Sequence, residues 1–380
     1  MPASAIRLLQ LTVFVSTLDR FAMPPVLIAI AHDLGVPLSD VVPAAGAYFL
    51  FYGLTQPVWG TVSDALGLVR TIRLAMLAAA VCTTAAAFAW TPLALGLTRG
   101  LAGGFFGAAY PGGLVYVGDT VPAEGRQREV ARLMVGLAVG TALASVGAGL
   151  VATVFTWRAA FVATGLAALA LAFVLGRLVE PPRSRGAGLL RPVAMIARSR
   201  AATFVLLLAF LEGAVLLGGL TLLPAAVEAA GASATVAGAV TGTFGLAVFG
   251  AANAVGRVSA RLAPARLIAA GATAELLACA AISVSRSPAV GLLAAVLIGV
   301  AWAAMHSTLQ TWATEVLPDA RATMVSLFAG ALFGGSATAA LLVADLVAAG
   351  RYGMIFAGAG ALTVPLGLLA TAGRARWRGP

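Results

Sequence analysis

Ionisable side chains occur inside long apolar stretches of this sequence, where each one needs a reason to be present. Asp19, Arg99 and Glu212 are the clearest cases. If these stretches cross a bilayer, a charge at its centre costs about 2.5–3.5 kcal/mol on insertion scales, so such residues usually have a function. We predict that Asp19, Glu212 and Arg99 handle protons, with the arginine as a switchable partner of the carboxylates. The alternative is a fixed ion pair between Asp19 and Arg99.

Asp19 belongs to a polar stripe. Thr12, Ser16, Asp19 and Met23 follow the spacing i, i+4, i+7 and i+11, which places them on one face of a helix. We expect this face to line a central cavity. Arg20 points about 100° away from Asp19 on the same helix. It is predicted either to bind an anionic group or to extend its guanidinium to the membrane surface.

Other polar and aromatic side chains in apolar stretches are predicted to bind a substrate. His306 is the most reactive of them, because an imidazole titrates near neutral pH; a hydrogen-bonded packing role is the alternative. The predicted substrate-binding set is Arg20, Tyr48, Tyr52, Gln56, Tyr110, Asn253, Trp302, His306 and Gln310.

The stretch GTVSDALGLVR at 60–70 interrupts the apolar sequence with an acid, glycines and a base. These residues are predicted to lie at the end of one membrane helix and the start of the next. We predict a conformational latch that holds one arrangement of the helices and is released during transport. Its residues are Gly60, Asp64, Gly67, Arg70 and Asp119. A solvated turn with incidental charges is the alternative.

The composition sets the class of protein. Of the 380 residues 61% are hydrophobic and only 10% are charged, with a mean hydropathy of +1.00. Soluble domains carry about 25% charged residues, and recurrent apolar stretches of 18 or more residues are typical of membrane helices. The fold class is therefore predicted to be an all-α membrane protein.

The basic residues exclude several functions. All 24 are arginines, so the sequence lacks the lysine that a Walker A loop or a retinal Schiff base requires. They form short clusters between apolar stretches rather than a nucleic-acid-binding face. The two cysteines, Cys82 and Cys279, have no metal-ligand spacing. We expect no nucleic-acid partner, no metal, no cofactor and no enzymatic activity.

Charged and Pro/Gly-rich breaks divide the chain into twelve apolar segments. These are 6–31, 41–63, 71–90, 93–118, 130–155, 158–177, 201–227, 235–256, 265–285, 288–314, 321–346 and 352–373. If the termini share a side, that side receives 19 arginines and the other receives three. By the positive-inside rule we predict a multi-pass protein of the cell (inner) membrane with both termini in the cytoplasm. The first segment is predicted to be a retained helix rather than a signal peptide.

The two halves of the chain repeat at an offset of 196 residues. Six of thirteen positions match between 60–72 and 256–268, and Pro92 pairs with Pro288 and Pro122 with Pro318 at the same offset. Six segments per copy give both copies the same orientation, which is the parallel repeat of many transporters. We predict an N-terminal six-helix bundle at 1–176, a cytoplasmic linker at 177–200 and a C-terminal six-helix bundle at 201–380, related by a pseudo-two-fold axis.

The sequence resembles the major facilitator superfamily. Gly60, Asp64 and Gly67 are similar to the family signature between its second and third helices, and RGLAGGFFGAAYPGGL from Arg99 resembles its fourth helix. TLDRFAMPPVLIAIAHDLGV in the first segment is similar to the drug:proton antiporters among the 12-helix families. The resemblance implies the major facilitator fold, alternating access and roles for Asp19 and Arg99 in proton transfer.

Three functions are open at this point. The first is a secondary active transporter, a proton-coupled efflux antiporter of an amphipathic compound or metabolite. The second is an uptake or exchange carrier for a small organic anion held by Arg20 and Arg99. The third is a non-transporting membrane receptor or assembly subunit. For the first, the expected partners are a small-molecule substrate, protons and the lipid bilayer, and the protein is expected to be a monomer.

Overall fold

The computed structural model describes residues 3–181, 190–259, 261–377 and 379, and within these ranges the ordered elements are all helices. The elements of the first half are α1 Ala3–Ala22, α2 Leu27–Leu34, α3 Leu38–Leu66, α4 Leu68–Ala86, α5 Pro92–Phe106, α6 Ala109–Thr120, α7 Ala123–Val154 and α8 Trp157–Val174. Those that follow are α9 Leu190–Arg198, α10 Arg200–Glu212, α11 Gly218–Glu228, α12 Ala234–Ser259, α13 Pro264–Val284, α14 Pro288–Ala301, α15 Ser307–Glu315, α16 Arg321–Leu342, α17 Ala344–Ala348 and α18 Tyr352–Arg376. The all-α membrane fold predicted from composition is confirmed.

Ten stretches of the described chain are long and apolar enough to cross a membrane. The expected segments 41–63 and 93–118 are the two that do not meet this standard, for different reasons. Segment 41–63 lies in the 29-residue α3, where two prolines and several polar side chains lower its hydropathy. Segment 93–118 is not a single helix, because α5 ends at Phe106 and α6 begins at Ala109.

Glycine and proline explain the break between α5 and α6. Pro111 has no N–H and cannot bond to the carbonyl of Gly107, four residues earlier. That carbonyl instead accepts a hydrogen bond from the Gln56 side chain on α3, at 3.3 Å. A break of the same kind occurs after α1, where Pro24 begins a short 3₁₀ turn before α2. The proline thus leaves a backbone carbonyl of one helix free to accept a hydrogen bond from a side chain of another helix.

Two π-helical turns interrupt the second half of the chain. Gly213–Leu217 separates α10 from α11, and Trp302–His306 separates α14 from α15. Such turns are rare and occur frequently at functional sites. Glu212 is the residue directly before the first turn, and His306 is the last residue of the second.

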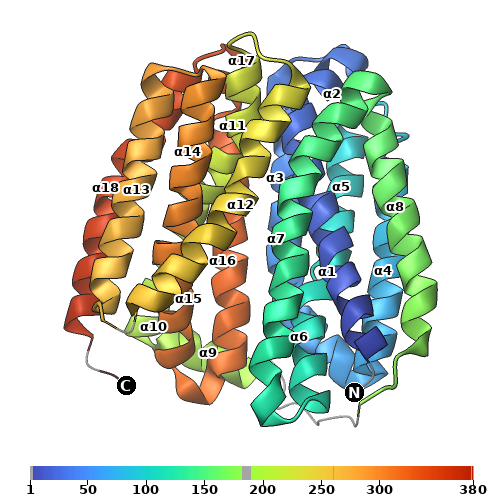
Figure 1. Ribbon diagram of the computed structural model, residues 1–380, viewed down its shortest axis with the longest axis vertical. Helices are drawn as coiled ribbons and strands as arrows, with labels where there is room; N and C mark the ends of the chain where they lie inside the picture. The colour runs from blue at the N-terminus through green and yellow to red at the C-terminus, as the bar shows by residue number, and fades with distance from the viewer. Residues whose placement is uncertain (1–2, 182–189, 260, 378, 380) are drawn as a thin grey trace.

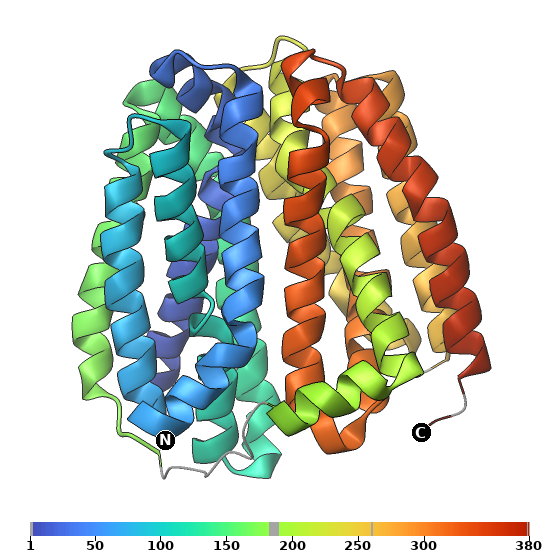
Figure 2. The ribbon, with the colours of Figure 1, turned by 180° about the vertical axis from the view of Figure 1, so that it is seen from behind.

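Helices α1–α8 form one group and α10–α18 a second group beside it, with both termini at the same end of the molecule (Figure 1). Figure 2 shows the same division from behind. Segment 177–200 contains α9, and its residues 182–189 lie outside the described residues. The domain boundaries 1–176, 177–200 and 201–380 remain predictions; α8 ends at Val174 and α10 begins at Arg200.

The two groups approach each other at glycines. Between α7 and α12, a Cβ on Gly238 would lie 2.3 Å from the Ser145 carbonyl oxygen, and one on Gly149 would lie 2.5 Å from that of Ala234. Between α3 and α16, Gly53 meets Gly330 backbone to backbone. Gly238 and Gly149 lie far from the termini along α12 and α7, whereas Phe249 and Val258, nearer the termini, are exposed. The two helix groups are therefore in close contact towards the end opposite the termini.

Candidate functional site

Asp19 and Arg99 form an ion pair with neither side chain exposed to solvent. The Arg99 Nη1 lies 3.0 and 2.9 Å from the two carboxylate oxygens of Asp19, and Nη2 donates to the Asp19 backbone carbonyl at 2.9 Å. Thr83 on α4 and Thr164 on α8 donate to the same carboxylate at 2.8 and 3.1 Å. Asp19 on α1 is thus held by three other helices.

Aromatic rings complete the surroundings of Arg99. Its guanidinium carbon lies 4.5 Å from the ring centres of both Tyr48 and Phe161, a cation–π distance on each side. We expected the polar stripe of α1 to face a central cavity, but the Asp19 carboxylate instead points inside the first helix group, towards α4 and α8. The structure brings Asp19 and Arg99 into contact. Whether this pair is switchable during transport or fixed stays a prediction.

Arg20 lies on the other side of α1, where the two helix groups meet. Its Nη2 donates to the Tyr52 hydroxyl at 3.3 Å, and its guanidinium carbon lies 4.5 Å from the Tyr52 ring and 5.8 Å from the ring of Phe333 on α16. The side chain is only 9% exposed. Within the described chain it makes no ion pair, and its Nε has no hydrogen-bond partner. A buried guanidinium without a carboxylate partner is a candidate for contact with an anionic group.

Glu212 and His306 form the second buried ionisable pair. His306 Nδ1 lies 3.2 Å from Glu212 Oε2, and the imidazole lies over Trp302 with ring centres 4.0 Å apart. Glu212 is fully buried, and its other oxygen, Oε1, has no hydrogen-bond partner among the described residues. Each residue adjoins or ends a π-helical turn. The sequence assigned Glu212 to proton handling and His306 to substrate, whereas the structure makes them one unit.

The remaining residues predicted to bind substrate fall into two groups, one buried or partly buried and the other exposed. Tyr48 and Tyr52 are buried with stacked rings, and the Tyr48 hydroxyl has no partner within the described chain. Gln56 donates to the Gly107 carbonyl at the break after α5, and Tyr110 lies partly buried just after that break. Asn253 and Gln310 are exposed on α12 and α15, and the Asn253 amide donates to the Phe249 carbonyl in its own helix. These two are not brought to the buried groups.

The predicted latch residues do not form a charge cluster in this conformation. Asp64, Arg70 and Asp119 are exposed, and none of the ion pairs in the described part of the chain joins them. A Cβ at Gly60 would meet open space, whereas Gly67 has φ +99°, a conformation that favours glycine. The latch stays a prediction for another conformation.

Sequence reasoning missed four residues around these sites. Thr83 and Thr164 are polar residues in apolar segments, a weak signal that could have placed them near a buried charge. Phe333 gave no signal, because one phenylalanine in an apolar segment usually packs against lipid or neighbours. Glu180 in the linker accepts from the backbone N–H groups of Val69 and Arg70 at 3.0 and 3.2 Å, which caps α4.

No group of three or more His, Cys, Asp or Glu residues is placed to hold a metal in the part of the chain that the structure describes. The buried ionisable residues of the described chain instead include two pairs, Asp19 with Arg99 and Glu212 with His306, together with Arg20 and Glu275. Repeated helix groups with buried ionisable residues and broken helices define a secondary transporter.

Comparisons with known proteins agree with this class. Residues 9–340 match the family model of the Major Facilitator Superfamily, and the chain belongs to that family. A search of curated proteins returned no match. The chain is a membrane transporter of a small solute rather than an enzyme.

Solved structures show the same fold. A bacterial homolog of the human lysosomal transporter Spinster, inward-facing and unoccupied, has a TM-score of 0.79 at 16% identity and covers 98% of this chain and 97% of its own. The peptide transporter POT in complex with sulfate has a TM-score of 0.80 at 14% identity, over 98% and 95%. A point mutant of the nucleoside transporter NupG has a TM-score of 0.76 at 15% identity, over 96% and 99%.

Proposed function

We propose that this protein transports a small organic solute with an anionic group, held at Arg20, and couples its movement to protons through Glu212 and His306. The observation on which this proposal rests is the buried, unpaired Arg20 guanidinium between the two helix groups. A substrate anion there would supply the missing countercharge. The sequence offered Arg20 and Arg99 as an anion clamp in one alternative function. Because Arg99 contacts Asp19, Arg20 is the member of that clamp without a carboxylate partner.

The surroundings of Arg20 support a substrate with an apolar or aromatic part. Tyr52 and Phe333 lie edge to face with ring centres 4.7 Å apart, and Phe49 stacks on Phe333 at 5.8 Å. Tyr52 and Phe49 come from α3, and Phe333 comes from α16. A ligand that contacts Arg20 therefore also contacts both helix groups, which is what alternating access requires of a substrate.

Proton coupling rests on the buried Glu212–His306 pair. Protonation of Glu212 removes its negative charge and weakens the contact with His306, and the pair joins α10 to the π-helical turn after α14. A proton on this pair would change how these two segments pack. Export by antiport, as the first apolar segment resembles, stays our prediction for the direction of transport.

Ligand binding tests the role of Arg20. Purified full-length protein is screened for thermal stabilisation by a panel of organic carboxylates, phosphates, and neutral and cationic compounds of similar size. We expect anions to stabilise the protein, and the stabilisation to disappear in Arg20→Gln and return partly in Arg20→Lys. Arg351→Gln, at an exposed arginine, is the matched control. Stabilisation by anions that survives in Arg20→Gln would refute the proposal.

A further inference from the structure

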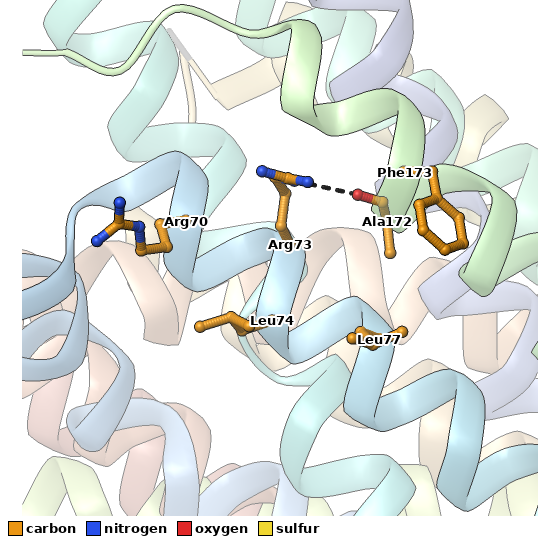
Figure 3. Close-up of a pocket in the computed structure, with 6 residues that line it drawn as sticks. All are labelled: Arg70, Arg73, Leu74, Leu77, Ala172 and Phe173. Carbon is orange, nitrogen blue, oxygen red and sulfur yellow. Dashed lines mark hydrogen bonds between the residues drawn. The ribbon is translucent and has the colours of Figure 1, made fainter.

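A groove on the outside of the first helix group is separate from Arg20, Glu212 and His306, although one of its arginines, Arg70, is also a predicted latch residue. It has a volume of about 270 Å³ and lies between α4 and α8, lined by Arg70, Arg73, Leu74, Leu77, Ala172 and Phe173. Figure 3 shows the two arginines on one stretch of α4, with the two leucines following them along the helix. The spacing i, i+3, i+4 and i+7 places all four on one face of α4.

The polar end of this groove has two guanidinium groups. Arg73 donates from Nε to the Ala172 carbonyl at 3.2 Å, which holds its side chain against α8 (Figure 3). Gly176 makes room for it, because a Cβ there would lie 2.9 Å from the Arg73 guanidinium carbon. Arg70 is exposed, and within the described chain neither arginine makes an ion pair. Glu180 accepts from the backbone N–H groups of Val69 and Arg70 and makes no ion pair with Arg70 or Arg73 in the described chain.

The other end of the groove is apolar and exposed. Leu74 is 50% exposed, Leu77 is 40% exposed and Phe173 is 69% exposed. Both helices belong to apolar stretches that are long enough to cross a membrane. In a bilayer these exposed apolar side chains would face acyl chains, and the arginines lie near the start of the stretch Leu68–Ala86. Within about one helical turn of α4 the lining changes from two arginines to two leucines. A phospholipid changes in the same way, from a charged headgroup to apolar acyl chains.

We propose that this groove binds one anionic phospholipid, with its phosphate on Arg70 and Arg73 and an acyl chain along Leu74, Leu77 and Phe173. Basic pockets between membrane helices are a recognised way to hold anionic headgroups. A soluble anion would use the two arginines but gain nothing from the apolar end. A zwitterionic lipid would fill the apolar end but bring no net charge to the arginines. Only an anionic lipid can use both the arginines at one end of the groove and the apolar side chains at the other.

Lipid binding to the full-length protein tests the site. The protein is reconstituted in phosphatidylcholine nanodiscs with increasing phosphatidylglycerol, and bound phosphatidylglycerol is measured by native mass spectrometry. With about 1 kcal/mol per arginine near the surface, the Arg70→Gln/Arg73→Gln double variant should bind phosphatidylglycerol about thirty-fold more weakly. The Arg70→Lys/Arg73→Lys variant should retain most of the binding, because it keeps both charges.

The control removes the same charge elsewhere at the same end of the molecule. Arg257 and Arg261, exposed at and after the end of α12, are replaced by glutamine together. Equal loss of phosphatidylglycerol in this control would show general attraction to charge and overturn the site. Glycerol phosphate alone should neither bind nor raise the melting temperature; if it matches the lipid, the site takes a soluble anion instead. Unchanged lipid binding in the folded double glutamine variant would also overturn it.

Discussion

At the scale of single residues, the two arginines of the first helix group that lie deep in apolar segments have different electrostatic situations. Arg99 has a carboxylate, a threonine hydroxyl and two aromatic rings, so its charge is fully compensated. Arg20 has a tyrosine hydroxyl and aromatic rings but no acid in the described chain. Adjacent positions on α1 thus hold an aspartate that is paired with Arg99 and an arginine that has no carboxylate partner in the described chain. The sequence located both arginines and offered Arg99 as the partner of Asp19, but it left open whether Arg20 lies in the protein interior or at the membrane surface.

Replacement of Asp19 tests whether its pair with Arg99 is structural. Removing one partner of a buried pair leaves an uncompensated charge and typically costs about 3–5 kcal/mol. We expect Asp19→Asn to lower the thermal unfolding temperature of the purified protein strongly, and Asp19→Asn combined with Arg99→Gln to recover part of the loss. Thr83→Val, which removes one hydrogen bond to the carboxylate, should cost about 1 kcal/mol. An Asp19→Asn protein that is as stable as the wild type but uncoupled from protons would instead assign Asp19 to proton transfer.

At the scale of elements, breaks in helices position the functional groups. Pro24 and Pro111 carry a signal in the sequence, because proline removes a backbone donor at a known position, but segments 6–31 and 93–118 were predicted without a break. The π-helical turns beside Glu212 and His306 could not be read in advance, since Gly213–Leu217 and Trp302–His306 contain no proline and arise from packing between helices. The chain segments could therefore be predicted, but the pairing of Glu212 with His306 required the tertiary structure.

The turn between α3 and α4 gives a matched pair of glycine variants. At Gly67 the backbone has φ +99° and ψ 147°, and a Cβ would lie 2.9 Å from the Glu180 carboxyl carbon. We expect Gly67→Ala to destabilise the protein by about 1–3 kcal/mol through backbone strain, and to displace the Glu180 cap. Gly60→Ala, in open space within α3, should stabilise it by about 0.5–1 kcal/mol. Thermal unfolding of both variants is the measurement. Equal effects at the two positions would contradict the account of this turn.

At the scale of the whole molecule, two helix groups meet through glycine-lined contacts far from the termini. The internal repeat and the even number of apolar segments predicted two bundles in the same orientation, and the family match and the solved neighbours agree with that fold. The conformation could not be predicted, because one sequence encodes every state of a transport cycle. The close contact between α7 and α12 belongs to one state of that cycle, so the sequence alone could not predict it.

Two glycines of α12 test this close contact. A Cβ on Gly238 would lie 2.3 Å from the Ser145 carbonyl oxygen of α7, whereas a Cβ on Gly250 would meet nothing within 4 Å. We expect Gly238→Ala to push α7 and α12 apart at the end opposite the termini. Spin-label distances between cysteines at Val154 and Val236, in a protein without Cys82 and Cys279, should lengthen in Gly238→Ala and not in Gly250→Ala. Unchanged distances in Gly238→Ala would show that this contact does not control closure.

The central claim is that proton movement at Glu212 and His306 drives the movement of an anion bound at Arg20. It is tested most directly in proteoliposomes with an imposed pH gradient, using an anion that stabilises the purified protein. We predict that the wild type moves this anion against its gradient, and that Glu212→Gln loses this movement while still exchanging labelled for unlabelled anion. Glu275→Gln, at another buried acid of the same helix group, is the control and should retain the wild-type behaviour. Gradient-driven accumulation in Glu212→Gln at the wild-type level would contradict the account.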